Sequence, residues 1–209
     1  MEDAGSPSAV SRDRRELPAR RRDPLKTINA LGLAGSLRVG SVNRTLLRAA
    51  VRAGEPRVRV RTFDLASVPL YNGDIEAQGD PSPVAELKEA VRDAHLVILA
   101  TPEYNAGLPG VMKNAVDWVS RPPRPNAWEG RPVAVMGATP GGFGTALAQL
   151  QLRSALAHVG ALVMPLPRFG VSQAHRAFAE DGSLADPATA ERLEHFLGSA
   201  AAWAARLAG

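Results

Sequence analysis

The sequence contains no cysteine among its 209 residues. Disulfides, iron–sulfur clusters and thiolate catalysis are therefore excluded, and any redox chemistry must come from a bound cofactor. The sequence also lacks an apolar run of the roughly 18 residues that a membrane span needs, and its first residues lack the apolar segment of a signal peptide. These absences predict a soluble, cytoplasmic protein that has no membrane partner.

A strong charge imbalance is also missing from most of the chain. The net charge is +4, but residues 1–26 hold seven basic and five acidic residues, which leaves 18 basic and 16 acidic residues in the remainder. The arginines of this first segment are mixed with prolines and acids and show no apolar period, which is typical of a disordered basic arm. We therefore expect an arm at 1–26, one domain at 27–209, and no nucleic-acid partner.

Apolar, β-branched runs alternate with segments whose apolar residues recur every three to four positions. The second kind of segment is typical of helices that cover a sheet. This alternation predicts an α/β fold, a doubly wound parallel sheet with helices on both faces, and five strands favour the flavodoxin-like order 2-1-3-4-5. The expected strands are Ile28–Ala34, Val58–Phe63, Leu96–Ala100, Val133–Ala138 and Ala161–Met164.

A polar, glycine-containing loop follows the first expected strand, at the carboxyl edge where such sheets bind ligands. It offers hydroxyls, a guanidinium, an amide and main-chain N–H groups at the start of a helix, which together suit an anion. A second interpretation stays open, because Ser41 or Asn43 could simply cap the helix that begins near Arg44. The candidate phosphate ligands are Ser36, Arg38, Ser41 and Asn43.

The spacing of this loop excludes two common phosphate motifs. Gly35 and Gly40 match the glycines of a Walker A motif, but Ser41 stands where its lysine belongs. The segment from Gly32 to Gly35 likewise lacks the G-x-G-x-x-G pattern of a dinucleotide-binding turn. The remaining fit is a single terminal phosphate.

Two further loops follow the third and fourth expected strands and should meet the first loop at the same sheet edge. Taken alone, the glycines of the later loop are best explained by an ordinary turn needing positive φ, but its position at the same sheet edge favours a loop whose main chain a ligand approaches closely. The earlier loop could also be an ordinary turn, since proline and asparagine are common there. The candidate ring-binding residues are Pro102, Glu103, Tyr104 and Asn105 in one loop, and Thr139, Gly141 and Gly142 in the other.

These three loops, together with the segment Gly107–Trp118, resemble the NAD(P)H-dependent FMN reductase family. That family has a flavodoxin-like fold and includes chromate, quinone and azo-dye reductases. The resemblance implies that FMN is the cofactor, that its phosphate lies on the loop at 35–43, and that its ring lies against Pro102–Asn105 and the glycines after Thr139. It also implies that NADPH or NADH delivers hydride to the flavin, which then reduces a small acceptor such as a quinone, azo dye, chromate or free flavin.

Because FMN carries the chemistry, no catalytic side chain is required, and no metal site is expected. The resemblance further implies a homodimer or homotetramer, with Lys113, Asn114, Asp117 and Trp118 as contact candidates, although a core position is an equal alternative for Trp118. Two other functions stay open. The first is a flavodoxin-like electron carrier that does not oxidise nicotinamide nucleotides, and the second is a flavin-sensing module that acts through its basic arm.

Overall fold

The computed structural model describes residues 27–208, so the arm expected at 1–26 lies outside the described residues. The strands are β1 (Ile28–Ala34), β2 (Val58–Phe63), β3 (Leu96–Ala100), β4 (Pro132–Ala138), β5 (Leu162–Val163) and β6 (Phe169–Val171). The helices are α1 (Val42–Gly54), α2 (Gly73–Glu76), α3 (Ser82–Asp93), α4 (Gly110–Val119), α5 (Ala146–His158) and α6 (Pro187–Leu207), with a 3₁₀ turn at Leu65–Ser67.

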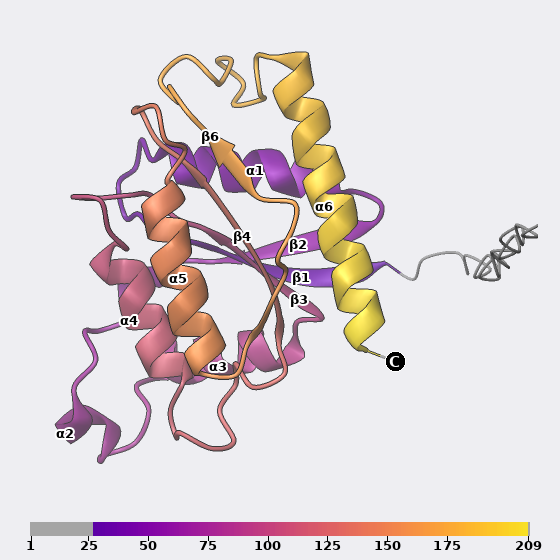
Figure 1. Ribbon diagram of the computed structural model, residues 1–209. Helices are drawn as coiled ribbons and strands as arrows, with labels where there is room; N and C mark the ends of the chain where they lie inside the picture. The colour runs from indigo at the N-terminus through magenta and orange to yellow at the C-terminus, as the bar shows by residue number, and fades with distance from the viewer. Residues whose placement is uncertain (1–26, 209) are drawn as a thin grey trace, which may run out of the picture.

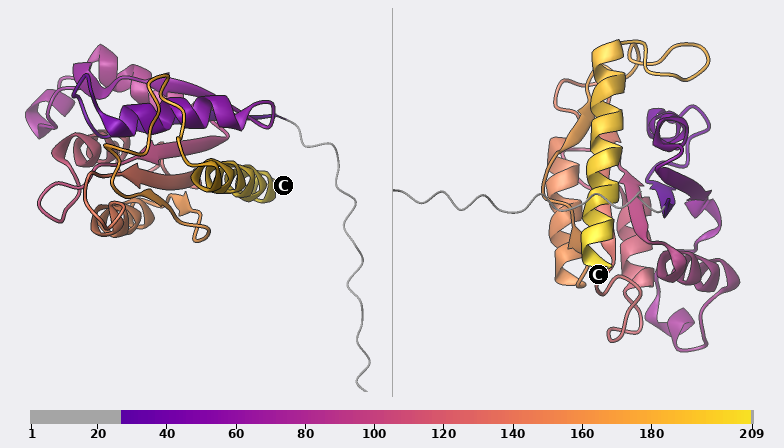
Figure 2. Two further views of the ribbon diagram at one scale, coloured as in Figure 1. Left: turned by 90° about the horizontal axis from the view of Figure 1, so that it is seen from above. Right: turned by 90° about the vertical axis from the view of Figure 1, so that its right-hand side faces the viewer.

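The strands form one parallel sheet in the order β2-β1-β3-β4-β5, which confirms the flavodoxin-like fold expected from the sequence. α1 and α6 pack on one face of the sheet, while α3, α4 and α5 pack on the other (Figures 1 and 2). Every residue of β3 and β4 is buried, as expected for central strands that are covered on both faces.

The last part of the sheet differs from the expectation. The strand expected at Ala161–Met164 is reduced to β5, and a separate strand, β6, was not predicted. β5 pairs with the first residues of β4, and β6 pairs with its last three. Pro165 and Pro167 stand between them, and because proline has no N–H to donate to the ladder, the edge strand is interrupted there.

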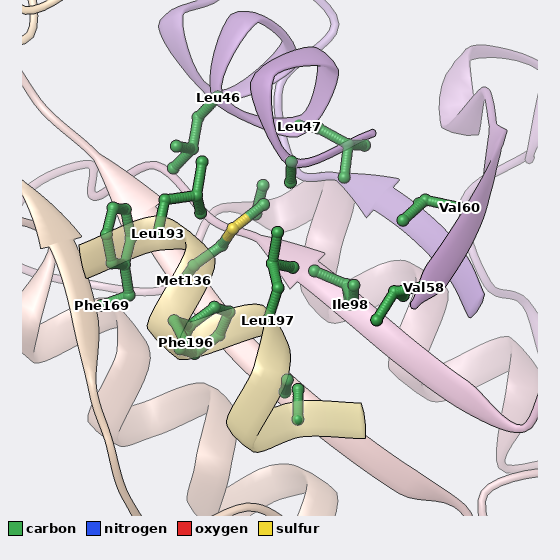
Figure 3. Close-up of a cluster of buried hydrophobic side chains, with 14 of the residues drawn as sticks. Leu46, Leu47, Val58, Val60, Ile98, Met136, Phe169, Leu193, Phe196 and Leu197 are labelled. Atoms are coloured by element: carbon green, nitrogen blue, oxygen red, sulfur yellow. The ribbon is translucent and has the colours of Figure 1, made fainter. Parts of the chain in front are cut away.

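The core on the α1/α6 face joins these helices to five strands, β1, β2, β3, β4 and β6. Figure 3 shows side chains from α1, α6, β2, β3, β4 and β6 meeting in one cluster. Phe169 of β6 lies 5.6 Å from Phe196 of α6 between ring centroids. β6 is thus anchored through its aromatic side chain as well as through its strand pairing, and it holds the chain beside the end of β4.

Three connections leave the carboxyl ends of the central strands. They join β1 to α1, β3 to α4 and β4 to α5, and they lie on the left of the molecule in Figure 1. In parallel sheets this edge is the usual ligand-binding edge, especially where neighbouring connections leave to opposite faces. α1 and α4 do leave to opposite faces here, so β1 and β3 flank the expected crevice.

Candidate functional site at the carboxyl edge of the sheet

The first loop, residues 35–41, ends in a capped helix. Ser41 is the N-cap residue of α1, and its Oγ accepts a hydrogen bond from the Arg44 N–H at 3.3 Å. Ser36 and Ser41 are both buried, while Arg38 is exposed and its Nη2 lies 3.4 Å from the Gly40 carbonyl oxygen. Ser41 therefore caps α1, which was one of the alternatives that the sequence left open. The guanidinium of Arg38 is exposed near the start of the same helix.

Main-chain donors in this loop are largely uncommitted. Among the described residues, the N–H groups of residues 37–40 have no protein acceptor, although the loop is closed by a hydrogen bond from the Ser41 N–H to the Arg38 carbonyl at 3.2 Å. The N-terminus of α1 adds the positive end of a helix dipole at the same place. The combination of free N–H groups, a helix N-terminus and an arginine is suited to a phosphate.

Asn43 has a different environment from the other expected phosphate ligands. Its Nδ2 donates to the Ala138 carbonyl at 2.8 Å, and its Oδ1 accepts from the Ala138 N–H at 2.8 Å. The side chain is buried and joins the first turn of α1 to the end of β4. Its amide is thus committed to holding two of the three loops together, which the sequence pattern did not indicate.

The second loop is a tight hairpin between β3 and α4. Tyr104 and Gly107 exchange two main-chain hydrogen bonds of 3.1 and 3.0 Å, and the two residues between them, Asn105 and Ala106, both have positive φ. Tyr104 is 51% exposed, and its hydroxyl donates to Ser36 Oγ at 3.3 Å. The structure therefore brings Tyr104 of the second loop to the first loop.

Glu103 makes contacts that lead away from the first loop. Its Oε2 accepts hydrogen bonds from the N–H groups of Leu147 (2.9 Å) and Ala148 (3.0 Å), at the start of α5. The residue at the N-cap position, Thr145, makes no side-chain cap bond of its own. Glu103 thus caps α5 from another loop, because a carboxylate at a helix N-terminus is stabilised by free N–H groups and the helix dipole.

The third loop, residues 139–145, is held mainly by the chain that follows β6. The Gln173 N–H donates to the Gly141 carbonyl at 3.0 Å, the Ala174 N–H to the Thr139 carbonyl at 2.9 Å, and Ser172 Oγ to the Gly142 carbonyl at 2.8 Å. Within the loop, the Gly141 N–H donates to Thr139 Oγ1 at 3.3 Å. These partners after β6 had no signal in the sequence, because the strand itself was not expected.

The glycines of the third loop have different roles. Positive φ occurs at Gly144 and Thr145, whereas Gly141 and Gly142 have ordinary backbone angles. A Cβ added at Gly142 would meet no protein atom within 4 Å, and one added at Gly141 would meet only Thr139 Oγ1. Side chains are thus absent where the loop faces open space, which leaves the main chain accessible to a ligand.

Two of the side chains expected at a subunit contact form hydrogen bonds within the chain itself. Trp118 is fully buried, and its Nε1 donates to the Pro69 carbonyl at 2.8 Å; Asn114 Nδ2 donates to the same oxygen, also at 2.8 Å. Both side chains hold the connection after β2 against α4. Lys113 and Asp117 form an exposed ion pair at 2.7 Å along the helix.

In the described part of the chain, no group of three or more His, Asp or Glu residues is placed to hold a metal ion. None of the described helices has the length and apolar character of a membrane span. The edge thus presents uncommitted main-chain N–H groups, one arginine, one exposed tyrosine and an accessible glycine pair. These groups lie at the ligand-binding edge of a flavodoxin-like sheet, and their chemistry suits a ligand with a terminal phosphate and a flat ring.

The chain belongs to the NADPH-dependent FMN reductase family, whose model matches residues 28–176. It is 40% identical over 182 residues to an NAD(P)H-dependent FMN reductase of Pseudomonas aeruginosa, covering 87% of this chain and 98% of that one. It is 36% identical to an NADPH:quinone oxidoreductase of Arabidopsis thaliana, covering 87% and 94%. These relatives identify the chain as an FMN-dependent oxidoreductase that uses NAD(P)H as electron donor.

A solved structure agrees with this family membership. The flavoenzyme NAD(P)H:(acceptor) oxidoreductase of Paracoccus denitrificans superposes with a TM-score of 0.81 at 36% identity, covering 86% of this chain and 98% of that one. A flavodoxin from the domain Archaea has a TM-score of 0.54 at 11% identity, a likeness that shows the shared fold alone. The membership of the FMN reductase family that the sequence predicted is thus confirmed.

Proposed function

We propose that the three loops form the FMN site and that the first loop binds the phosphate. The observation that carries this proposal is the set of N–H groups at residues 37–40, which have no protein acceptor in the described chain and lie at the N-terminus of α1. Ser36 and Ser41 add hydroxyls, and Arg38 adds a charge-assisted donor. Asn43 supports the site indirectly, because its amide holds the end of β4 against this loop.

The ring of the cofactor belongs between the second and third loops. Tyr104 is exposed and can pack on a flat ring, while Pro102, Asn105 and Thr139 shape the turns on either side. The N–H of Gly142, which has no acceptor among the described residues, would place a donor against the ring edge where negative charge grows on reduction, while the Gly141 N–H is held by Thr139 Oγ1. Glu103 supports this arrangement by tying the second loop to α5.

FMN, when bound, supplies the group that accepts hydride from the nicotinamide and passes electrons to the acceptor. The protein's part is to bind and orient, so the acceptor needs only access to the site. The exposed side chains of Tyr104 and Phe143, the latter 85% exposed, leave the edge open to planar molecules. We therefore assign small quinones as the acceptor class.

Stopped-flow mixing tests this function directly. The FMN-loaded protein, mixed anaerobically with NADPH or NADH, should bleach at the flavin absorbance maximum, and a small benzoquinone added next should restore the absorbance. Steady-state rates should give the parallel double-reciprocal lines of a ping-pong reaction. Tight FMN binding without nucleotide oxidation would instead favour the electron-carrier alternative.

We propose that the molecule is a homodimer, or a homotetramer built from two dimers, and that the outer surface of α5 forms a subunit contact. Leu147 and Leu150 of this helix are 48% and 57% exposed, which places two large apolar side chains next to the third loop. Trp118 of α4 cannot serve, because it is buried in its own protomer. Leu147→Glu should shift sedimentation at micromolar concentration toward monomer, and a wild type that already sediments as monomer would exclude the proposal.

We also propose that residues 27–209 form the working domain and that the enzyme acts in the cytoplasm, where a nicotinamide donor is supplied. The described residues already contain every loop assigned to FMN. A version that begins at residue 26 should keep the flavin content and melting temperature of the full chain. A large loss of either would show that the preceding segment is part of the fold or the site.

A further inference from the structure

Arg153 of α5 is a half-buried cation that makes few hydrogen bonds. Its Nη1 donates to the Met164 carbonyl at 2.6 Å, where the chain leaves β5. Its Nε and Nη2 are buried and have no hydrogen-bond partner among the described residues. Burial lowers the pKa of the Arg153 guanidinium below its usual range, and the nearby positive charge of Arg168 lowers it further. Leaving buried N–H groups of a charged side chain unpaired is costly, so a negative charge near Arg153 would stabilise it.

A pocket of about 230 Å³ adjoins both arginines. Its wall includes Gly142 and Phe143 of the third loop, Leu150 of α5, and Arg153 and Arg168, and it contains no carboxylate. Arg168 is exposed, and it makes no ion pair within residues 27–208. The pocket therefore carries two positive charges that no described protein group neutralises, which is the electrostatic character of an anion site.

The position of the pocket limits what the anion can be. The pocket shares Gly142 and Phe143 with the loop that we assign to the flavin ring. A nicotinamide that delivers hydride must lie against that ring, so the remainder of the nucleotide must extend over a neighbouring surface. The exposed ring of Phe143 offers a stacking surface for a base at the mouth of the pocket.

We infer that this pocket binds the 2′-phosphate of NADPH, and that Arg168 and Arg153 select NADPH over NADH. The inference rests on the proposed function. The 2′-phosphate is a dianion that NADH lacks, and guanidinium groups are the side chains best suited to hold it. Arg168 would pair with the phosphate at the mouth, and Arg153 would add a second positive charge beneath it.

Binding of nucleotide fragments tests this site without any redox reaction. Titration calorimetry on the full-length FMN-loaded protein should show that adenosine 2′,5′-bisphosphate binds more tightly than 5′-AMP. Arg168→Ala should weaken the bisphosphate about ten- to hundredfold and leave 5′-AMP unchanged. Arg153→Met, checked for an unaltered fold by circular dichroism, should weaken the same ligand. Equal binding of the two fragments by the wild type would overturn the inference.

Arg176→Ala is the matched control. Arg176 is also exposed and lies near the third loop, but its Nη2 donates to Gln173 Oε1 at 3.0 Å and it does not line the pocket. This variant should bind both fragments as the wild type does. A loss equal to that of Arg168→Ala would show that only the overall charge of the edge matters, which would contradict a specific site.

Kinetics separate this inference from the proposed function. Arg168→Glu should raise the KM for NADPH far more than the KM for NADH and leave kcat with NADH unchanged, because the 2′-phosphate that NADH lacks is the group placed next to this side chain. An equal loss of kcat/KM with NADPH and with NADH would contradict the inference while leaving the reductase assignment intact. Failure of the wild type to oxidise either nucleotide would contradict the assignment itself. If Arg168→Glu changed the sedimentation coefficient but not nucleotide binding, the pocket would be a contact with a neighbouring subunit, and the inference would be overturned.

Discussion

The first and third loops lie at the same sheet edge but use their main-chain groups in opposite ways. In the first loop, four successive N–H groups at residues 37–40 have no acceptor in the described chain. In the third loop, the carbonyls of Thr139, Gly141 and Gly142 are all engaged by the segment after β6. The N–H donors of the first loop are therefore free to bind a ligand, whereas the carbonyl acceptors of the third loop form hydrogen bonds that hold that loop in place.

This difference indicates that the two loops have separate roles within one site. A loop with free donors gains stability when an anion arrives, so its ligand should stabilise the fold. A loop already fixed by its neighbours changes little on binding and can present its main chain in a preset position. Substitutions that disturb the groups packed against the third loop should thus affect stability first, and those in the first loop should affect ligand affinity first.

The largest effect is expected from Gly137→Ala in β4. An added Cβ would overlap Thr145 Oγ1 and would lie 2.5 Å from the Thr101 carbonyl oxygen, both of which belong to the packed interior. Overpacking against main chain should cost about 3 kcal/mol or more of unfolding free energy. Urea unfolding of the FMN-free protein measures it, with Gly142→Ala as the control, since a Cβ there meets nothing within 4 Å. Equal stability of the two variants would show that β4 is not packed closely against Thr145 and Thr101 at the start of this loop.

A somewhat smaller loss is expected from Asn43→Ala. The change leaves the buried N–H and carbonyl of Ala138 without partners, which should cost about 2–3 kcal/mol even in the absence of flavin. Thermal unfolding of the FMN-free protein is the appropriate measurement. If Asn43 were instead a phosphate ligand and nothing more, the apoprotein would melt as the wild type does and only FMN affinity would fall.

The smallest stability effect is expected from Glu103→Gln. The neutral amide can still accept from the N–H groups at the start of α5, but it loses the attraction of a carboxylate for the helix N-terminus. The expected loss is about 1 kcal/mol of unfolding free energy. Because the interaction is between a charge and a dipole, the difference from wild type should shrink at high salt. A difference that is independent of salt would indicate a packing effect instead.

The sequence was sufficient for the fold and the three loops because both depend on local patterns. Apolar runs, helical periodicity and the position of polar residues after each strand are all visible in the chain. The roles of Asn43 and Glu103 could not be predicted from the sequence. The partner of Asn43 lies 95 residues away and the first partner of Glu103 lies 44 residues away, and both are main-chain groups, which carry no residue-specific signal. Trp118 was left between core and interface for the same reason, since its partner is the carbonyl of Pro69.

β6 and Arg153 show a second limit. A three-residue strand that follows two prolines has too short an apolar run to stand out, yet it supplies the chain that fixes the third loop. The unpaired nitrogens of Arg153 depend on what surrounds the side chain in three dimensions. Buried N–H groups without a partner are a property of packing, and the sequence alone does not reveal them.

Arg38→Ala tests whether the first loop binds the phosphate of FMN. Removing this charge-assisted donor should weaken FMN by about 1.5–3 kcal/mol, or roughly ten- to hundredfold, in fluorescence titrations of the apoprotein. Riboflavin, which lacks the phosphate, should bind weakly and equally to both proteins. The control is Arg48→Ala, which removes the same charge from an exposed position on α1. Equal FMN affinity in the wild type and Arg38→Ala would contradict the claim.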